Sequence, residues 1–125
     1  MPFIKIWIHL VWSTKLRAPL LTKDIRQTVF QHMLTNAKAK GIHLDFVNGY
    51  TDHVHCIISL NREQTIAKIV QLIKGESSFW INSNKLCKEK FEWQDEYFAV
   101  SVSESGINAV RNYIKNQEAH HSKKT

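Results

Sequence analysis

The period of the hydrophobic pattern changes several times along the chain, and the order of these changes limits the fold more than any other feature. In four stretches, polar and apolar residues alternate or β-branched and aromatic residues gather, as is typical of strands. In three others, apolar residues recur every three or four positions, as on one face of an amphipathic helix. The sequence therefore predicts strands at 3–13, 42–50, 53–60 and 97–103, and helices at 22–41, 65–84 and from 105 onward.

The predicted order is strand, helix, strand, strand, helix, strand and helix. The first six elements match the βαββαβ unit of ferredoxin-like folds, an antiparallel sheet with two helices on one face. Only Thr51 and Asp52 separate the second strand from the third, so these strands are expected to form a hairpin. We therefore expect an α+β, ferredoxin-like fold followed by a C-terminal helix. The length suits one domain, so residues 1–125 are interpreted as a single domain.

The chain is basic, with a net charge of +6 and an isoelectric point near 9.5. A basic surface attracts polyanions, most commonly nucleic acids, although charge alone fits an ordinary solvated surface equally well. Cys56 and Cys87 are far apart and lack CxxC spacing, which argues against a disulfide framework or a zinc ribbon. No run of about 18 apolar residues and no secretory leader pattern is found, so we expect a cytoplasmic protein that does not bind membranes.

Two histidines stand on the third predicted strand. His53 and His55 are two positions apart, so their side chains project from the same face with roughly 7 Å between the Cα atoms. Two imidazoles on one face can chelate a metal, but such a pair alone fits a structural role as well. Asp52 could orient a metal ligand or simply form the turn, and His9 comes near the pair if the first and third strands are neighbours.

The last predicted helix carries an unusual polar stripe. Five polar residues occur at offsets of zero, three, four, seven and eight, which places them on one helical face: Tyr113, Asn116, Gln117, His120 and His121. A stripe that faces a core would be apolar. A stripe that faces solvent usually carries Lys and Glu, and not Tyr, Gln and His as here. The amide oxygen of Gln117 could complete a metal site with the two histidines.

Outside these two motifs, the candidate functional residues are basic or aromatic. Lys15 and Arg17 lie in a predicted loop and could contact a DNA backbone, or be solvated as loop residues commonly are. Trp80 and Trp93 could stack on bases, although the helical spacing of Trp80 favours a place in the core.

The chain resembles the single-tyrosine transposases of bacterial and archaeal insertion sequences, which belong to the HUH nuclease superfamily. The resemblance rests on two motifs in the family's order: His53-Val54-His55 within DHVHCIISL, and Tyr113 followed four residues later by Gln117 within YIKNQEAHH. The segments IHLVWSTKLRAPLL and WQDEYFAVSVSES are also similar to the family, so the match extends over nearly the whole chain.

The resemblance implies a reaction and a role for each motif. Tyr113 would be the nucleophile that becomes linked to the 5′ phosphate of single-stranded DNA and frees a 3′ hydroxyl. His53, His55 and Gln117 would hold Mg²⁺ or Mn²⁺. Asp52 and His9 stay candidates for orienting these ligands because of their positions, not because of the resemblance. Imidazoles favour zinc, copper, iron or nickel, so phosphate oxygens and water would complete a magnesium or manganese site.

The resemblance also implies partners and a setting. The substrate would be single-stranded DNA, with hairpins at the ends of a mobile element, in a prokaryotic cytoplasm. Nucleic-acid contacts are expected from five polar or basic residues, Lys15, Arg17, Asn116, His120 and His121. Enzymes of this family act as homodimers, and the tyrosine helix of one subunit can serve the histidines of the other.

Two other functions remain open from the residues alone. A non-catalytic ferredoxin-like module could bind DNA or RNA hairpins, with salt-sensitive binding that ignores metal. A small metal-dependent hydrolase could use water as its nucleophile, and would then tolerate Tyr113→Phe but not His53→Ala.

Overall fold

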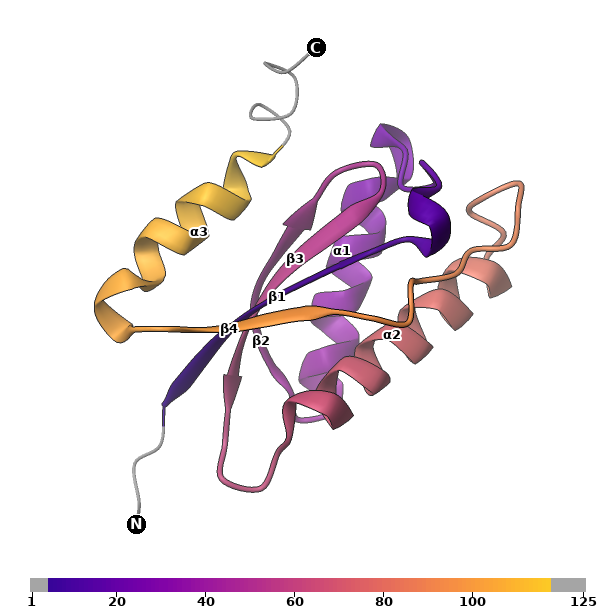
Figure 1. Ribbon diagram of the computed structural model, residues 1–125. Helices are drawn as coiled ribbons and strands as arrows, with labels where there is room; N and C mark the ends of the chain where they lie inside the picture. The colour runs from indigo at the N-terminus through magenta and orange to yellow at the C-terminus, as the bar shows by residue number, and fades with distance from the viewer. Residues whose placement is uncertain (1–4, 118–125) are drawn as a thin grey trace.

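A computed structural model describes residues 5–117, and here the elements follow the predicted order (Figure 1). The strands are β1 (Ile6–Ser13), β2 (His43–Gly49), β3 (His53–Leu60) and β4 (Phe98–Val102). The helices are α1 (Lys23–Ala39), α2 (Ile66–Ser83) and α3 (Ile107–Lys115), and two short 3-10 turns are η1 (Lys15–Arg17) and η2 (Glu104–Gly106). Among residues 5–117, no helix is long and apolar enough to cross a membrane.

The strands form one sheet in the order β2-β3-β1-β4, and every neighbouring pair is antiparallel. Helices α1 and α2 cover one face of this sheet, and α3 lies on the opposite face (Figure 1). The predicted α+β fold, ferredoxin-like with an additional C-terminal helix, is therefore confirmed.

The larger core lies between the sheet and the pair α1 and α2. Alternate residues of β1 and β3 point into it, because successive side chains of a strand face opposite sides of the sheet. Its fully or almost fully buried members include Leu10, Val29, Phe30, Val54, Ile58, Ile69 and Ile81.

A smaller apolar cluster holds α3 against the other face of the sheet. Ile107 and Ile114 of α3 pack there with Trp7 of β1 and Ile57 of β3. Burying an isoleucine contributes about 1.5–3 kcal/mol relative to exposure, whereas an isolated helix of nine residues is not stable in water. Packing on the sheet therefore explains why α3 forms.

Helix α1 ends at Ala39, two residues before the predicted end at residue 41, and Gly41 forms the turn that follows. This glycine has a φ of 73°, which an L side chain rarely adopts. Its backbone N–H donates to the carbonyl of Lys38 at 3.1 Å, and the N–H of Ile42 donates to that of Ala37 at 2.9 Å. The pair of bonds is a Schellman motif, and it turns the chain from α1 into β2.

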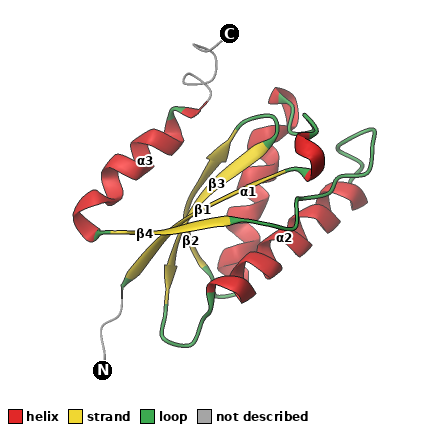
Figure 2. Ribbon diagram, in the orientation of Figure 1, coloured by secondary structure: helices red, strands yellow, loops and turns green. Residues whose placement is uncertain are grey.

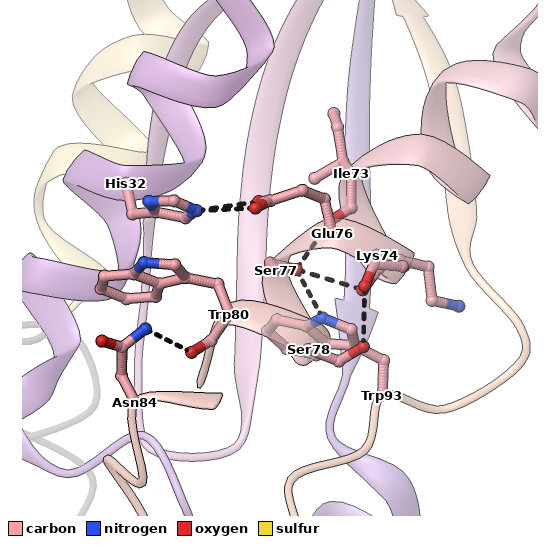
Figure 3. Close-up of polar contacts among 10 residues, drawn as sticks. His32, Ile73, Lys74, Glu76, Ser77, Ser78, Trp80, Asn84 and Trp93 are labelled. Atoms are coloured by element: carbon pink, nitrogen blue, oxygen red, sulfur yellow. Dashed lines mark hydrogen bonds and ion pairs between the residues drawn. The ribbon is translucent and has the colours of Figure 1, made fainter. Parts of the chain in front are cut away.

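The connection between α2 and β4 folds back along α2 (Figure 2). Asn82 exchanges two hydrogen bonds with the backbone of Phe91, at 2.8 and 3.0 Å. The indole N–H of Trp93 donates to Ser77 at 2.9 Å (Figure 3), and the ammonium of Lys74 donates to the carbonyls of Gln94 and Asp95. These α2 side chains fix the connection in place.

Both tryptophans that were considered as base-stacking residues pack against other side chains of the protein. Trp93 is 8% exposed and packs edge-on against Phe91 and Trp12, so the suggestion that it stacks on bases is wrong. Trp80 packs against the larger core, as its spacing indicated. Its outer face stacks on His32 of α1, whose ring also contacts Glu76 (Figure 3).

Candidate active site

A hollow of about 770 Å³ opens where α3 ends above β3, and it is called the histidine hollow below. It is lined by the end of β1, by η1, by the start of β3, by residues 94–98 before and at the start of β4, and by residues at the end of α3. The lining residues that carry chemistry are Arg17, His53, His55, Tyr97, Tyr113 and Gln117.

His53 and His55 lie together on the α3 side of β3, as their spacing predicted. Each is 7% exposed, because α3 covers this face of the strand. Their ring centroids are 5.1 Å apart and the rings are almost perpendicular. The Nε2 atom of His53 lies 3.4 Å from the amide oxygen of Gln117. Two ring nitrogens and one amide oxygen therefore share a small space.

Tyr113 reaches this space from the last turn of α3. Its ring centroid lies 5.8 Å from that of His55, edge to face, while half of the residue remains exposed. Gln117 is buried and donates to the carbonyl of Tyr113 at 3.3 Å. A single chain thus brings its own tyrosine to its own histidines.

The polar stripe expected along the last helix is interrupted. Helix α3 ends at Lys115, and Asn116 is its C-cap. The side chain of Asn116 is exposed and donates to the carbonyl of Asn112 at 2.9 Å, so it does not line the histidine hollow with Tyr113 and Gln117. His120 and His121 lie outside the described residues.

Asp52 and Arg17 support His53 from the far side of its ring. One carboxylate oxygen of Asp52 lies 2.8 Å from Nδ1 of His53, and the other accepts from Arg17 at 3.1 Å. Burial alone would raise the pKa of Asp52, but the hydrogen bond with His53 and the charge of Arg17 outweigh it and lower that pKa. A charged Asp52 favours a proton on Nδ1 of His53, which leaves the Nε2 lone pair for a ligand.

Asp52 therefore has both of the roles considered for it, because it forms the hairpin turn and also orients His53. Arg17, expected at a DNA backbone, directs its Nε to this carboxylate. Lys15 pairs with Glu92 at 3.1 Å, and both basic side chains remain more than half exposed. The adjacent Gly49 keeps the turn tight, because a Cβ there would lie 2.2 Å from the carbonyl oxygen of His53.

His9 supports the second histidine. β1 and β3 are neighbours, and Nε2 of His9 lies 3.0 Å from Nδ1 of His55, with the two rings stacked. Burial lowers the pKa of His9, so this imidazole is neutral near pH 7. A neutral His9 can accept the Nδ1 proton of His55, and Nε2 of His55 then keeps its lone pair.

Two residues of β2 hold α3 in place, and neither role was predicted from the sequence. Asp45 makes two hydrogen bonds to the guanidinium of Arg111, at 2.8 and 3.0 Å. The amide of Asn48 donates to the last carbonyls of α3, those of Ile114 and Lys115, at 3.1 and 3.3 Å. Both lie on the strand face that α3 covers. The available signal was that Asp45 and Asn48 are polar residues beside the apolar Phe46 and Val47.

Replacing Asp45 with asparagine should loosen α3. The paired carboxylate–guanidinium bonds are charge-assisted and partly buried. Asparagine is uncharged and keeps only one oxygen acceptor, so the variant should have a lower free energy of unfolding. Amide hydrogen exchange should accelerate in Ile107–Lys115 more than in β1 or β3. Glu63→Gln, at an exposed loop residue, is the control. Unchanged protection of α3 in Asp45→Asn would show that the apolar contacts suffice.

The donor set fits a divalent metal ion. Residues 5–117 contain no group of three or more His, Cys, Asp and Glu suited to a metal, but the third donor here is a glutamine. Two neighbouring ligands of one magnesium ion, each at about 2.0–2.1 Å from it, lie roughly 3 Å apart. The separation of 3.4 Å between His53 Nε2 and Gln117 Oε1 is close to that value.

Comparison with known proteins places this geometry in a family. A family model described as "Transposase IS200 like" matches residues 3–117. The ISDra2 transposase TnpA of Deinococcus radiodurans is 27% identical over 115 residues, which covers 87% of this chain and 81% of the relative.

Two solved structures share the fold. A protein of D. radiodurans R1, described as a transposase and solved at 1.90 Å, has a TM-score of 0.74 and 24% identity, and the match covers 93% of each chain. A REP-associated tyrosine transposase bound to a REP hairpin has a TM-score of 0.68 and 17% identity, covering 97% of this chain and 72% of that one. Since the family model spans nearly all of the sequence, this chain belongs to the IS200-like transposases.

Proposed function

We propose that this chain is an enzyme that cleaves and rejoins single-stranded DNA at the ends of a mobile element, with Tyr113 as its nucleophile. The observation that carries the proposal is the position of Tyr113. Its ring contacts His55 in the hollow that also contains His53 and Gln117, and half of the residue is exposed. A phosphate in this hollow could therefore reach the phenol oxygen.

The reaction is a transfer of one phosphodiester bond to the tyrosine. The phenol oxygen of Tyr113 attacks the phosphorus and loses its proton, the bond from phosphorus to the 3′ oxygen breaks, and that oxygen leaves as a 3′ hydroxyl. The 5′ phosphate remains joined to Tyr113. Attack by another 3′ hydroxyl reverses these steps, so rejoining needs no nucleotide cofactor.

His53, His55 and Gln117 are proposed to hold Mg²⁺ or Mn²⁺. When bound, such an ion polarises the scissile phosphate and offsets the charge that develops on it. Asp52 and His9 hold the two imidazoles in the tautomers that present Nε2, through their contacts at 2.8 and 3.0 Å. The hydrogen bond of Gln117 to the carbonyl of Tyr113 couples the third ligand to the nucleophile's turn of the helix.

The proposed DNA partner carries a hairpin. A structural relative is bound to a REP hairpin, and the net charge of +6 suits a polyanion. Lys15, Arg17 and Asn116 are exposed and remain proposed phosphate contacts. His120 and His121 are proposed for the same role because of their positions in the sequence after Tyr113 and Gln117.

We also propose a homodimer that forms through β4. This strand is at the edge of the sheet, and Phe98 and Val100 on it are 61% and 42% exposed. An exposed edge with apolar side chains is a template for pairing with another strand. Because one chain already brings Tyr113 to its own histidines, the dimer would not be needed to complete the site.

The test is the capture of a covalent adduct. Labelled single-stranded DNA hairpins from the flanks of the gene are incubated with the protein and Mg²⁺ or Mn²⁺, then run on a denaturing protein gel. A labelled protein band that EDTA abolishes is the expected result. Cleavage without an adduct would indicate water as the nucleophile. Salt-sensitive binding without cleavage would indicate a non-catalytic binding module.

A further inference from the structure

A second hollow of about 820 Å³ runs along α2 and is not part of the histidine hollow. One wall is α2, and the other is the connection formed by residues 90–97. Lys74 and Asn82 donate hydrogen bonds to that connection, and Ser77 accepts one from Trp93, so these bonds fix the distance between the walls. This hollow is called the α2 groove below.

Small residues lie on the side of the groove that α2 forms. They include Ala67, Gly75 and Ser78. A Cβ added to Gly75 would meet nothing within 4 Å, so this part of the surface is open. An extended chain can therefore lie close to the backbone of α2.

Large apolar side chains are exposed along the groove. Phe79 is 71% exposed although it lies on the helix that covers the larger core, and Tyr97 is 39% exposed. Leu16 is 89% exposed and has a φ of 56°, a left-handed conformation uncommon for a residue with a side chain. None of the three is used by the core, whereas exposed rings beside a groove are what stacking on unpaired bases requires.

The charge of the groove favours a polyanion. Lys15 and Lys90 both line it, and both pair with one carboxylate, that of Glu92, at 3.1 and 3.2 Å. The two lysines therefore leave one positive charge in excess at this rim. Their hydrogen bonds lower the pKa of Glu92, which keeps that carboxylate ionised, but both ammonium groups remain well exposed to a ligand.

The α2 groove is continuous with the histidine hollow. Leu16, Gln94 and Tyr97 line both. A strand whose phosphate lies at Tyr113 would reach the groove past these shared residues. We infer that the α2 groove binds the unpaired nucleotides on one side of the cleaved phosphate, with Phe79 as a stacking platform; this inference rests on the proposed function.

The test measures how binding depends on the unpaired flank. Fluorescence anisotropy gives the Kd for a labelled DNA hairpin whose flank, on either the 5′ or the 3′ side, has about two or about ten nucleotides. EDTA is present so that the strand stays intact. For the wild type, lengthening one flank should tighten binding about tenfold or more, and Phe79→Ala should remove most of this gain.

Two further variants make the result specific. Phe79→Trp keeps an aromatic ring and should keep the gain. Ile6→Ala removes an exposed apolar side chain outside both hollows and should also leave the gain unchanged. A gain of equal size in Phe79→Ala and wild type, or no gain in the wild type, would overturn the inference.

The adduct assay separates this inference from the proposed function. An adduct at Tyr113 without any flank-dependent gain would leave the transposase proposal intact and remove the groove. Flank-dependent binding that requires Phe79 but gives no adduct would keep the groove as a binding site for single strands and remove the proposed reaction.

Discussion

Tyr113→Phe should abolish the covalent adduct and lower DNA cleavage about a thousandfold or more. The substitution removes one oxygen atom, the proposed nucleophile, and keeps the ring that contacts His55. Because the residue is half exposed, the fold should be unaffected. The measurement is cleavage of a labelled hairpin in Mn²⁺, followed on denaturing DNA and protein gels.

Tyr50→Phe is the matched control for this prediction. Tyr50 lines neither hollow, so the variant loses a phenol oxygen away from the proposed site. It should form the adduct at close to the wild-type rate, since its ring is retained. Cleavage that survives in Tyr113→Phe would show that another oxygen, from water or from a second side chain, attacks the phosphate.

The sequence was sufficient for the fold because each element carries its own period. The alternation in β1 and β3 separates residues that face α1 and α2, such as Leu10 and Val54, from those on the other side, such as Trp7 and Ile57. The same alternation placed His53 and His55 on one face. Such an alternation predicts which side chains share a face, because successive side chains of a strand point to opposite faces of the sheet.

The support around the site could not be predicted, because it depends on contacts between distant segments. Asp45 and Asn48 act on α3, which lies more than 60 residues further along the chain. Arg17 reaches Asp52 only because η1 returns beside the hairpin turn. Nothing in the local sequence specifies such partners.

The polar stripe predicted for the last helix shows that a helical period cannot be extended beyond the residue at which the helix ends. A regular helix through residues 113–121 would carry Asn116 on the same face as Tyr113. Instead α3 ends at Lys115, where Asn48 bonds its last carbonyls and Asn116 turns back to Asn112. The tyrosine and Gln117 still meet, because Gln117 is buried and bonds to the carbonyl of Tyr113.

His53→Ala should greatly weaken metal binding and slow metal-dependent cleavage while leaving hairpin binding intact. The variant removes one of three proposed ligands and the partner of Asp52. Losing a ligand should weaken Mn²⁺ binding by about a hundredfold or more. Losing the charge stabilisation supplied by the ion should slow cleavage by roughly a hundredfold to a thousandfold. Titration calorimetry with Mn²⁺ measures the first effect, and the adduct gel measures the second.

His43→Ala is the control for the loss of an imidazole. His43 lies on β2 of the same sheet, its side chain is 61% exposed, and it lines no part of the histidine hollow. It should bind Mn²⁺ and cleave DNA as the wild type does. His53→Gln tests whether the buried position merely needs a polar side chain, because glutamine can accept from a neighbour but cannot supply an imidazole nitrogen. If His53→Ala is folded and binds Mn²⁺ with unchanged affinity, the metal lies elsewhere; if His53→Gln restores both binding and cleavage, the position needs only a polar donor atom.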